Sequence, residues 1–502
     1  FARPRQVLAA TRVAEVLPAL GAVEDAVASQ GLYAAGFVLY EAAPAFDPAL
    51  VVKERPDFPL LWFGLFEPPE VISLPPAPAQ PGPGDLAWQA SITPAEYDCA
   101  IERIKQFIRT GDTYQVNFSY RLRTALELPP EEMFHWLSQP QAPPYGALIE
   151  TGDWAICSAS PELFFRLEGT EIESRPMKGT RPRGLGYEQD RRLADELRAS
   201  PKDQAENVMI VDMVRNDLGR IAEVGSVSVP ALFDVEQYPT VWQMTSTVRA
   251  RTRASVAAIF QALFPPASIT GAPKPRTMEI IAALESTPRR IYTGAIGFLA
   301  PGRRAQFNVA IRTLLIDKPR RQAEYGVGGG IIWDSQPEAE QQECRVKARI
   351  LRPPPPDFDL LESILWTPEE GYSLLDYHLT RLEQSASFFG FKYDMARVRQ
   401  ALDRLAASLP PQPHKARLLL ARTGSVAVES APAPSGGFGA IALAGAPVDA
   451  SNPLLYHKTT QRQVYQQALA TRPGAADVLL FNENGEVTAS IIANVAVEIE
   501  GA

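Results

Sequence analysis

The chain has 502 residues, of which 46% are hydrophobic and 21% are charged, and its formal net charge is −9. This length allows two or more domains with their own buried cores, and the negative charge argues against a nucleic-acid-binding protein. The three cysteines (Cys99, Cys157 and Cys344) show no metal-ligand spacing, which favours a reducing compartment. The sequence has no run of about 18 apolar residues that could cross a membrane. We therefore expect a cytoplasmic protein that acts without nucleic acid or membrane.

Strand-like and helical runs follow one another up to residue 351. Strands are predicted where apolar and β-branched residues dominate short runs, and helices where apolar residues recur every three or four positions. The predicted strands are 146–150, 154–160, 162–169, 293–300, 306–317 and 323–334, and the predicted helices are 203–222 and about 337–348. Strands that follow one another directly favour an α+β fold with antiparallel sheet over regular β-α alternation.

Two proline-rich segments interrupt these runs. Residues 74–84 read "LPPAPAQPGPG" and predict a surface loop, whereas residues 352–357 read "RPPPPD". Consecutive prolines favour an extended conformation and end helices. We therefore place a linker at 352–357, between a domain at 1–351 and a second domain at 358–502.

The two predicted helices each carry a pair of acidic residues. Asp203 and Glu206 lie three positions apart, as do Glu340 and Glu343, so each pair shares one helix face. Lys347 follows one turn after Glu343. Magnesium is bound by a few carboxylates together with water and substrate oxygens, so the two pairs could converge on such an ion. The spacing alone favours the plainer interpretation, solvated faces with surface salt bridges.

Three further features could bind an anion. Gly328–Gly330 begin a strand-like run, where backbone N–H groups could approach a carboxylate; a bulge or tight turn is the alternative. Thr270, Gly271 and Lys274 lie near a predicted helix N-terminus, which either binds an anion or is a plain helix start. Arg312 is predicted inside an apolar strand, where its guanidinium needs a partner from the protein or from a substrate.

Lys178 lies in the stretch "RPMKGTRPRG", at 175–184, which predicts a glycine- and arginine-rich turn. A free lysine has a pKa of about 10.4 and is protonated at neutral pH. It becomes a nucleophile only when burial or a neighbouring cation lowers that value. Local sequence alone favours a solvated loop lysine.

Nine stretches in the same order across 111–348 resemble the chorismate-utilising enzymes. They include "GDTYQVNFSYRL", "SASPELFFRL", "RPMKGTRPRG", "ITGAPKPRTMEII", "NVAIRT" and "GGGIIWDSQPEAEQQECRVKA". The resemblance implies a large chorismate-binding domain of α+β class, with a β-sandwich-like core flanked by helices. It also implies a Mg²⁺ ion that joins the ring carboxylate of chorismate to Glu206 and Glu343, with Asp203 and Glu340 alongside. The substrate-binding positions that it implies are Thr270, Gly271, Lys274, Tyr292, Arg312, Gly328, Gly329, Gly330 and Lys347.

The residues at two positions distinguish the reactions catalysed by different members of this family. The turn reads PxAGT in anthranilate synthases but PxKGT in aminodeoxychorismate synthases, and the water-using members have a lysine where this chain has Gln115. Lys178 together with Gln115 is the aminodeoxychorismate synthase pattern, so the resemblance implies that Lys178 is a nucleophile and that Glu162 is the acid that helps the C4 hydroxyl leave. At Gln243 family members often have histidine; glutamine donates a hydrogen bond but cannot supply a proton.

The resemblance also implies a partner subunit that supplies ammonia, and two other functions remain open. The sequence has no nucleophilic-cysteine elbow of a glutaminase, so ammonia would come from a separate glutamine amidotransferase subunit, with free ammonia as a substitute. The alternatives are an anthranilate synthase component I-like enzyme and a non-catalytic scaffold that binds an amidotransferase.

Residues 358–502 resemble part of a fold-type IV α/β domain that uses pyridoxal 5'-phosphate, especially aminodeoxychorismate lyase. Lys458 matches the lysine that binds the cofactor, and Arg381 matches a contact of its phosphate. Ala489 stands where a glutamate is expected beside the pyridine nitrogen, which would leave the cofactor poorly tuned. An active lyase domain would release pyruvate and yield 4-aminobenzoate, the folate precursor, from one chain. A degenerate or structural domain fits the sequence equally well.

Overall fold

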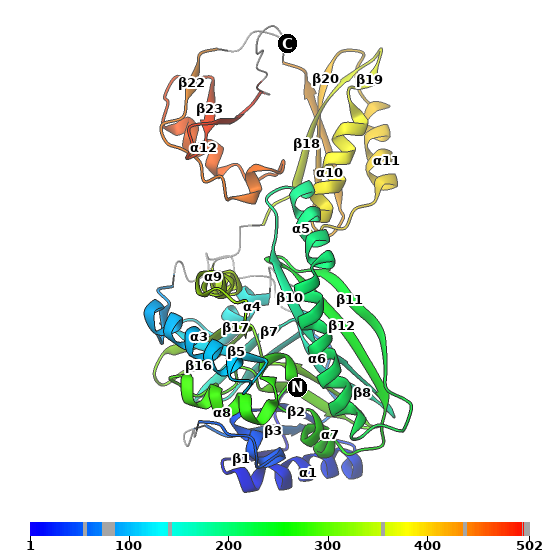
Figure 1. The fold of residues 1–502 in the computed structure, drawn as a ribbon. Coiled ribbons are helices and arrows are strands. Elements are labelled where there is room, and N and C mark those ends of the chain that lie inside the picture. Colours follow the sequence, from blue (N-terminus) through cyan, green and yellow to red (C-terminus); the bar gives the residue numbers. More distant parts are fainter. Residues whose placement is uncertain are drawn as a thin grey trace. The chain divides into compact units, whose positions relative to one another are not determined.

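The computed structural model describes residues 1–53, 58–72, 86–138, 143–352, 357–434, 439–493 and 495. The proline-rich segment 74–84 and prolines 353–356 of the expected linker lie outside these residues. The chain divides into two compact units (Figure 1). Unit 1 comprises Phe1–Pro182 and Ala194–Pro354, and unit 2 comprises Arg183–Leu193 and Pro355–Ala502. The short segment Arg183–Leu193 therefore belongs to unit 2, although it is flanked in sequence by unit 1.

Two antiparallel sheets form the described part of unit 1. In the larger sheet the strand order is β1 (Gln6–Ala10), β3 (Leu61–Phe66), β2 (Tyr33–Val38), β14 (Ala295–Ala300), β15 (Arg304–Val309), β8 (Leu163–Glu168), β9 (Glu171–Arg175), β12 (Val241–Arg251) and β10 (Met177–Pro182), and β11 (Ser228–Gln237) also pairs with β12. In the smaller sheet the order is β13 (Gly271–Ala272), β5 (Gln115–Ala125), β17 (Gln322–Ile331), β16 (Thr313–Asp317), β7 (Trp154–Ser160) and β6 (Tyr145–Glu150), with β4 (Gln89–Ala90) on β5.

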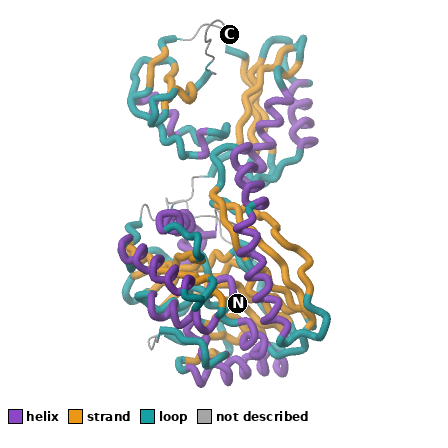
Figure 2. Tube along the Cα trace, viewed as in Figure 1, coloured by secondary structure: helices purple, strands orange, loops and turns teal. Residues whose placement is uncertain are grey.

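Helices cover the outer sides of these sheets, as the purple tubes of Figure 2 show. They are α1 (Val13–Gln30), α2 (Ala43–Phe46), α3 (Pro94–Arg109), α4 (Pro130–Ser138), α6 (Pro201–Gly219), α7 (Val256–Leu263), α8 (Lys274–Leu284) and α9 (Pro337–Lys347). Helix α5 (Tyr187–Ala199) begins in unit 2 and ends in unit 1. The short 3₁₀ turns are Tyr40–Ala42, Ala267–Ile269 and Ala348–Leu351. Helix α6 starts where the side chain of Ser200 accepts a hydrogen bond from the N–H of Asp203, and Pro201 needs no such partner.

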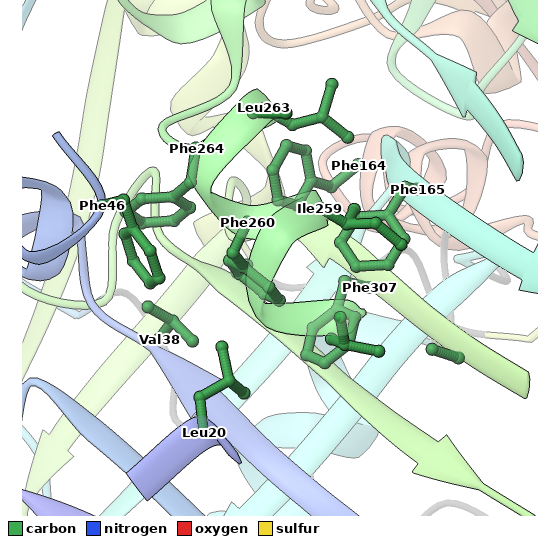
Figure 3. Packing of buried hydrophobic residues seen from close by; sticks show 14 of the residues in the cluster. Leu20, Val38, Phe46, Phe164, Phe165, Ile259, Phe260, Leu263, Phe264 and Phe307 are labelled. Atoms are coloured by element: carbon green, nitrogen blue, oxygen red, sulfur yellow. The ribbon is translucent and has the colours of Figure 1, made fainter. Parts of the chain in front are cut away.

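Apolar clusters hold the described part of unit 1 together, and three of them pack against its two sheets. Between the larger sheet and α1, α6 and α7, Phe260 packs against the rings of Phe165 and Phe307, with centroids 5.5 and 5.1 Å away (Figure 3). A second cluster lies between the smaller sheet and α3, α4, α8 and α9. In the third cluster the two sheets meet, with Phe37 of β2 and Ile156 of β7 among its members. The expected β-sandwich-like core flanked by helices is confirmed.

Two local predictions were wrong. The run 306–317 is not one strand, because β15 belongs to the larger sheet and β16 to the smaller one, so the chain crosses between the sheets at Ala310–Arg312. Arg312 lies in this crossing with a φ of +50°, not inside a strand. Gly328–Gly330 do not begin a strand either; they lie in the last part of β17, paired with Asn117–Ser119 of β5.

The described part of unit 2 contains two smaller sheets. One has the order β19 (Gly371–Tyr372), β18 (Leu360–Thr367), β20 (His414–Leu420) and β21 (Val426–Pro432), and packs on α10 (Leu375–Phe389) and α11 (Met395–Ala406). The other has the order β22 (Ile441–Leu443), β23 (Asp477–Phe481) and β24 (Val487–Ser490), beside α12 (Gln463–Ala470) and the 3₁₀ turn Pro453–Leu455. No helix among the described residues is long and apolar enough to cross a membrane.

Candidate active site

A cavity of about 220 Å³ lies in unit 1, between β10, β17, α6 and α9. It collects residues from many separate parts of the sequence, from Asn117 to Lys347. The predicted site residues that line it are Glu162, Lys178, Asp203, Glu206, Tyr292, Arg312, Gly328, Gly330, Glu340, Glu343 and Lys347. Gln115, Thr270, Gly271, Lys274 and Gly329 are not among the lining residues.

Lys178 is a buried strand residue and not a solvated loop lysine. It lies in β10, where Lys178 and Gly179 together face the single residue Met244 of β12, so the strand bulges at this point. Burial lowers the pKa of Lys178, and the nearby Lys347 lowers it further, while Glu206 acts in the opposite direction. The deprotonated amine that a nucleophile needs is therefore easier to form here than in water.

Glu162 lies on another wall of the cavity and is 3% exposed. Its Oε1 accepts a 2.5 Å hydrogen bond from Ser268 Oγ. Burial raises the pKa of Glu162 to about 7, although Ser268 and Lys178 each favour the charged form. A carboxyl with this pKa is partly protonated near neutral pH and can act as a general acid.

The four acidic residues of α6 and α9 differ in their partners. Asp203 pairs with Arg181 at 2.7 Å, Glu340 accepts from Ser335 Oγ at 2.7 Å, and Glu343 pairs with Lys347 at 2.6 Å. Glu206 makes no hydrogen bond or ion pair with the described residues.

Burial and neighbouring charges set the protonation of these acids. Burial raises the pKa of Glu206 and of Glu340, and the charge of Glu343 adds to both shifts. Burial alone would also raise the pKa of Glu343, but the Lys347 ammonium holds it below its usual range. Since these carboxylates repel one another, a cation placed between them would be stabilised.

These residues fit the magnesium ion that the sequence resemblance implies. A Cβ built on Gly329 would lie 3.2 Å from Glu340 Oε2 and 3.6 Å from Glu343 Oε1, so the glycine leaves space in front of both oxygens. No three His, Cys, Asp or Glu side chains in the described ranges come close enough to enclose a metal on their own. An open site with two carboxylates and with water or substrate oxygens is the usual arrangement for magnesium.

Cationic and polar groups line the rest of the cavity. Arg312 lies over the ring of Tyr238, with its Cζ 5.3 Å from the centroid, and burial lowers its pKa. Lys347 Nζ donates to the carbonyl oxygen of Gly328 at 2.9 Å. Tyr292 is buried, with the guanidinium of Arg121 4.9 Å above its ring. Arg312, Tyr292 and Lys347 thus bring two positive charges and a hydroxyl to the cavity, and groups of this kind can bind carboxylates.

Gln115 lies just behind Lys178. A Cβ on Gly330 would come within 2.2 Å of Gln115 Nε2 and 2.7 Å of Lys178 Nζ, so both nitrogens face the same small space. Gln115 is 1% exposed, and within the described part of the chain its Oε1 has no hydrogen-bond partner. Any side chain at Gly330 would displace both of these groups.

Three predicted substrate contacts lie behind the cavity wall. Lys274 pairs with Asp217 at 3.1 Å and donates to the carbonyl of Leu263 at 3.2 Å. Thr270 is fully buried and donates within its own turn. At Gly271 a Cβ would overlap the carbonyl oxygen of Gln115, which lies 2.0 Å away, so this glycine permits the close contact of β13 with β5.

Sequence reasoning missed several residues that line the cavity: Asn117, Thr180, Lys202 and Ser268. Asn117 and Thr180 lie inside stretches that carry the resemblance, and Ser268 directly precedes one, which was the available signal. Their roles depend on contacts with distant residues, which spacing does not reveal.

In unit 2, Lys458 lies near a compact charged group. Burial lowers the pKa of Lys458, and its carbonyl accepts from the N–H of Leu361 at 2.9 Å. Arg381, however, donates to both carboxylate oxygens of Glu362, at 2.8 and 2.6 Å, and His378 also contacts Glu362. A phosphate would have to approach Arg381 beside this carboxylate, and Ala489 offers no acid to a pyridine nitrogen. Apart from Lys458, the described residues therefore do not provide the groups that would bind the phosphate and the pyridine nitrogen of pyridoxal phosphate.

Two family models match this chain, each over a different region. A family model described as chorismate binding enzyme matches residues 3–353, so the chain belongs to the chorismate-binding enzymes. A second model, amino-transferase class IV, matches residues 359–502.

Individual relatives match the first of these regions. Aminodeoxychorismate synthase component 1 of Salmonella typhimurium is 43% identical over 270 residues, which are 53% of this chain and 59% of that protein. Anthranilate synthase component 1 1 of Haloarcula marismortui is 42% identical over 271 residues, 53% of this chain and 55% of that protein. The chain thus spans little more than half the length of these relatives. Among solved structures, anthranilate synthase component I from Streptococcus pneumoniae superposes on this chain with a TM-score of 0.62 and 25% sequence identity. The match covers 70% of this chain and 91% of the chain in that crystal structure.

Proposed function

We propose that unit 1 converts chorismate and ammonia into 4-amino-4-deoxychorismate through a covalent adduct with Lys178. The observation that carries this proposal is the burial of Lys178 in the cavity, where its pKa is lowered and Glu162 stands nearby. The aminodeoxychorismate synthase relatives support this product, and the anthranilate synthase relatives support the same substrate.

The reaction exchanges a hydroxyl for an amine at one carbon in two displacements. Lys178 Nζ adds to C2 of the ring, the ring double bond shifts, and the C4–O bond breaks. Glu162 gives its proton to the departing hydroxyl, which leaves as water. Ammonia then adds to C4, the double bond shifts back, and the C2–N bond to Lys178 breaks. The added nitrogen loses a proton, which restores Glu162, so the net change is chorismate plus ammonia to aminodeoxychorismate plus water.

The other cavity residues hold the substrate. Arg312, Tyr292 and Lys347 are placed to bind carboxylates, and Gln115 is placed to orient the amine of Lys178. Glu206 and Glu343 would hold magnesium, with Asp203 and Glu340 beside them; when bound, this ion supplies positive charge for the ring carboxylate. Thr270, Gly271 and Lys274 would support the wall behind these groups.

We also propose that a glutamine amidotransferase subunit supplies the ammonia. The relatives named component 1 support a second component, and free ammonia at high concentration would replace it. Because the contacts of Arg381 and Ala489 disfavour pyridoxal phosphate in unit 2, we propose that this chain releases aminodeoxychorismate, which feeds 4-aminobenzoate and folate synthesis after a further lyase step.

The test is mass analysis of the products formed from chorismate, magnesium and an ammonium salt. Aminodeoxychorismate from the wild type, with its formation abolished in Lys178→Ala, supports the proposal. Anthranilate as the main product would assign the chain to the other relatives, and unchanged chorismate would indicate a scaffold. Pyruvate formed without added lyase, and abolished by Lys458→Ala, would show that unit 2 works with pyridoxal phosphate after all.

A further inference from the structure

The bulge in β10 fixes where Lys178 points. Two residues, Lys178 and Gly179, face one residue of β12, and the regular pairing resumes at Thr180, which lies opposite Gln243. Gly179 has a φ of +93°, and a Cβ there would meet Asp203 of α6 at 3.1 Å. A bulge leaves backbone groups without their usual ladder partners, so other groups must hold it in place.

Gln243 uses both ends of its amide on this bulge. Its Nε2 donates to the carbonyl oxygen of Gly179 at 2.8 Å, and its Oε1 accepts from Thr180 Oγ1 at 3.1 Å. The side chain is 9% exposed and lines the cavity beside Lys178. Because the Gly179 carbonyl oxygen can only accept, the amide must present its NH₂ group to it, which leaves Oε1 to accept from the Thr180 hydroxyl.

Asn207 holds the neighbouring peptide from the other side. Its Nδ2 lies 3.4 Å from the carbonyl oxygen of Lys178, and its Oδ1 accepts from Ser246 Oγ at 2.6 Å. Asn207 is 1% exposed and follows Glu206 on α6. The two carbonyl oxygens at the bulge are therefore each contacted by a side-chain amide, one from α6 and one from β12.

We propose that Gln243 is a positioning residue for Lys178. With Asn207, it holds the bulge in the one conformation that directs the Lys178 amine toward the space beside Gly330. Gln243 itself supplies no proton and acts through Lys178. This inference rests on the proposed role of Lys178 as the nucleophile.

The test replaces Gln243 by methionine in the full chain, which keeps the length and neutral charge of the side chain but removes both hydrogen bonds. Gln306→Met is the control, because Gln306 lies on β15 of the same sheet and does not line the cavity. We expect Gln243→Met to lower kcat for chorismate by about tenfold or more with little change in KM, because a small misplacement of a reacting group lowers the rate steeply. Gln306→Met should stay within about twofold of the wild type.

A second readout needs no chorismate. Labelling with acetic anhydride over a pH series, followed by mass spectrometry, measures the apparent pKa of Lys178 directly. In Gln243→Met the lysine should gain access to water, and its apparent pKa should rise toward the ordinary value. The shorter variant Gln243→Asn keeps an amide but cannot reach both partners, so it should shift in the same direction if the methionine variant folds poorly.

The outcomes separate the two proposals. An unchanged kcat and an unchanged labelling profile in both Gln243 variants would overturn the positioning role. A rise in KM alone, with Lys178 labelled as in the wild type, would mean that Gln243 contacts the substrate instead. If Lys178→Ala still makes product, the nucleophile proposal fails, but the labelling shift would still show whether Gln243 positions the lysine.

Discussion

Ser268 Oγ donates a 2.5 Å hydrogen bond to Oε1 of Glu162, and both side chains are buried. The two residues are 106 positions apart in sequence. The backbone of Glu162 is also fixed, because its N–H donates to Ser160 Oγ and its carbonyl accepts from the N–H of Val309. Glu162 is therefore held at its side chain and its backbone, as a group that transfers a proton in a defined direction must be.

Removing this hydrogen bond should change the pH dependence of the reaction. Glu162 acts in its protonated form, so activity should fall as the pH rises through its pKa of about 7. Ser268 favours the charged form, so Ser268→Ala should raise that pKa and move the basic limb of kcat to higher pH. Activity at the optimum should fall by about tenfold, because the carboxyl is less well oriented. If kcat falls at the same pH in Ser268→Ala as in the wild type, a group other than Glu162 causes that fall.

The covalent adduct can be observed when ammonia is withheld. With chorismate and magnesium alone, the wild type should gain the mass of chorismate less one water on the peptide that contains Lys178. Lys178→Ala should show no adduct and should lower aminodeoxychorismate formation on the order of 10³-fold. The control is Lys318→Ala, which removes a surface lysine paired with Glu150 on the smaller sheet. An adduct on any other residue would contradict the assignment.

Glu206 should control the affinity for magnesium. It is the carboxylate of the four that makes no ion pair or hydrogen bond with the described residues, so it is free to bind a cation. Glu206→Gln should raise the magnesium concentration needed for half-maximal activity by about 10–100-fold, whereas Glu279→Gln on the surface of α8 should leave it unchanged. Isothermal titration with magnesium alone gives a readout that is independent of turnover. Equal magnesium affinity in both variants would exclude Glu206 as a ligand.

The sequence predicted the parts of the site that depend on local spacing. The helices that carry Asp203 with Glu206 and Glu340 with Glu343 are present as α6 and α9. Two residues three positions apart lie on the same face of any helix, whatever the rest of the chain does. The sandwich of two sheets was available only from the resemblance to a family.

Contacts between distant residues could not be predicted in this way. Burial of Lys178 depends on the bulge opposite Met244 and on Gly330 of β17, and neither is visible in the stretch around the lysine. Arg312 was expected inside a strand because its neighbours are apolar, but those neighbours are buried in two different sheets. Lys274 was expected near the substrate, yet its ammonium group forms an ion pair with Asp217.

A buried charge network supports the cavity from behind, and its removal should destabilise unit 1. Glu285 pairs with Arg289 at 2.7 Å and with Arg121 at 3.4 Å, and all three side chains are 3% exposed or less. Arg289 also donates to the carbonyl oxygens of Asn117 and Ile269, which line the cavity, at 2.6 and 2.8 Å.

Glu285→Ala would leave the two arginines buried without their shared carboxylate, which costs about 3–5 kcal/mol in comparable cases. We expect a drop of that size in the free energy of unfolding, measured by urea denaturation and followed by tryptophan fluorescence. Glu279→Ala, on the exposed side of α8, which ends just before Glu285, should change it by less than about 0.5 kcal/mol. Because the network holds Asn117 and Ile269, Glu285→Ala should also weaken chorismate binding at temperatures where the variant is still folded. A Glu285→Ala protein as stable as Glu279→Ala would show that the arginines find other partners and that the network is not what supports the cavity wall.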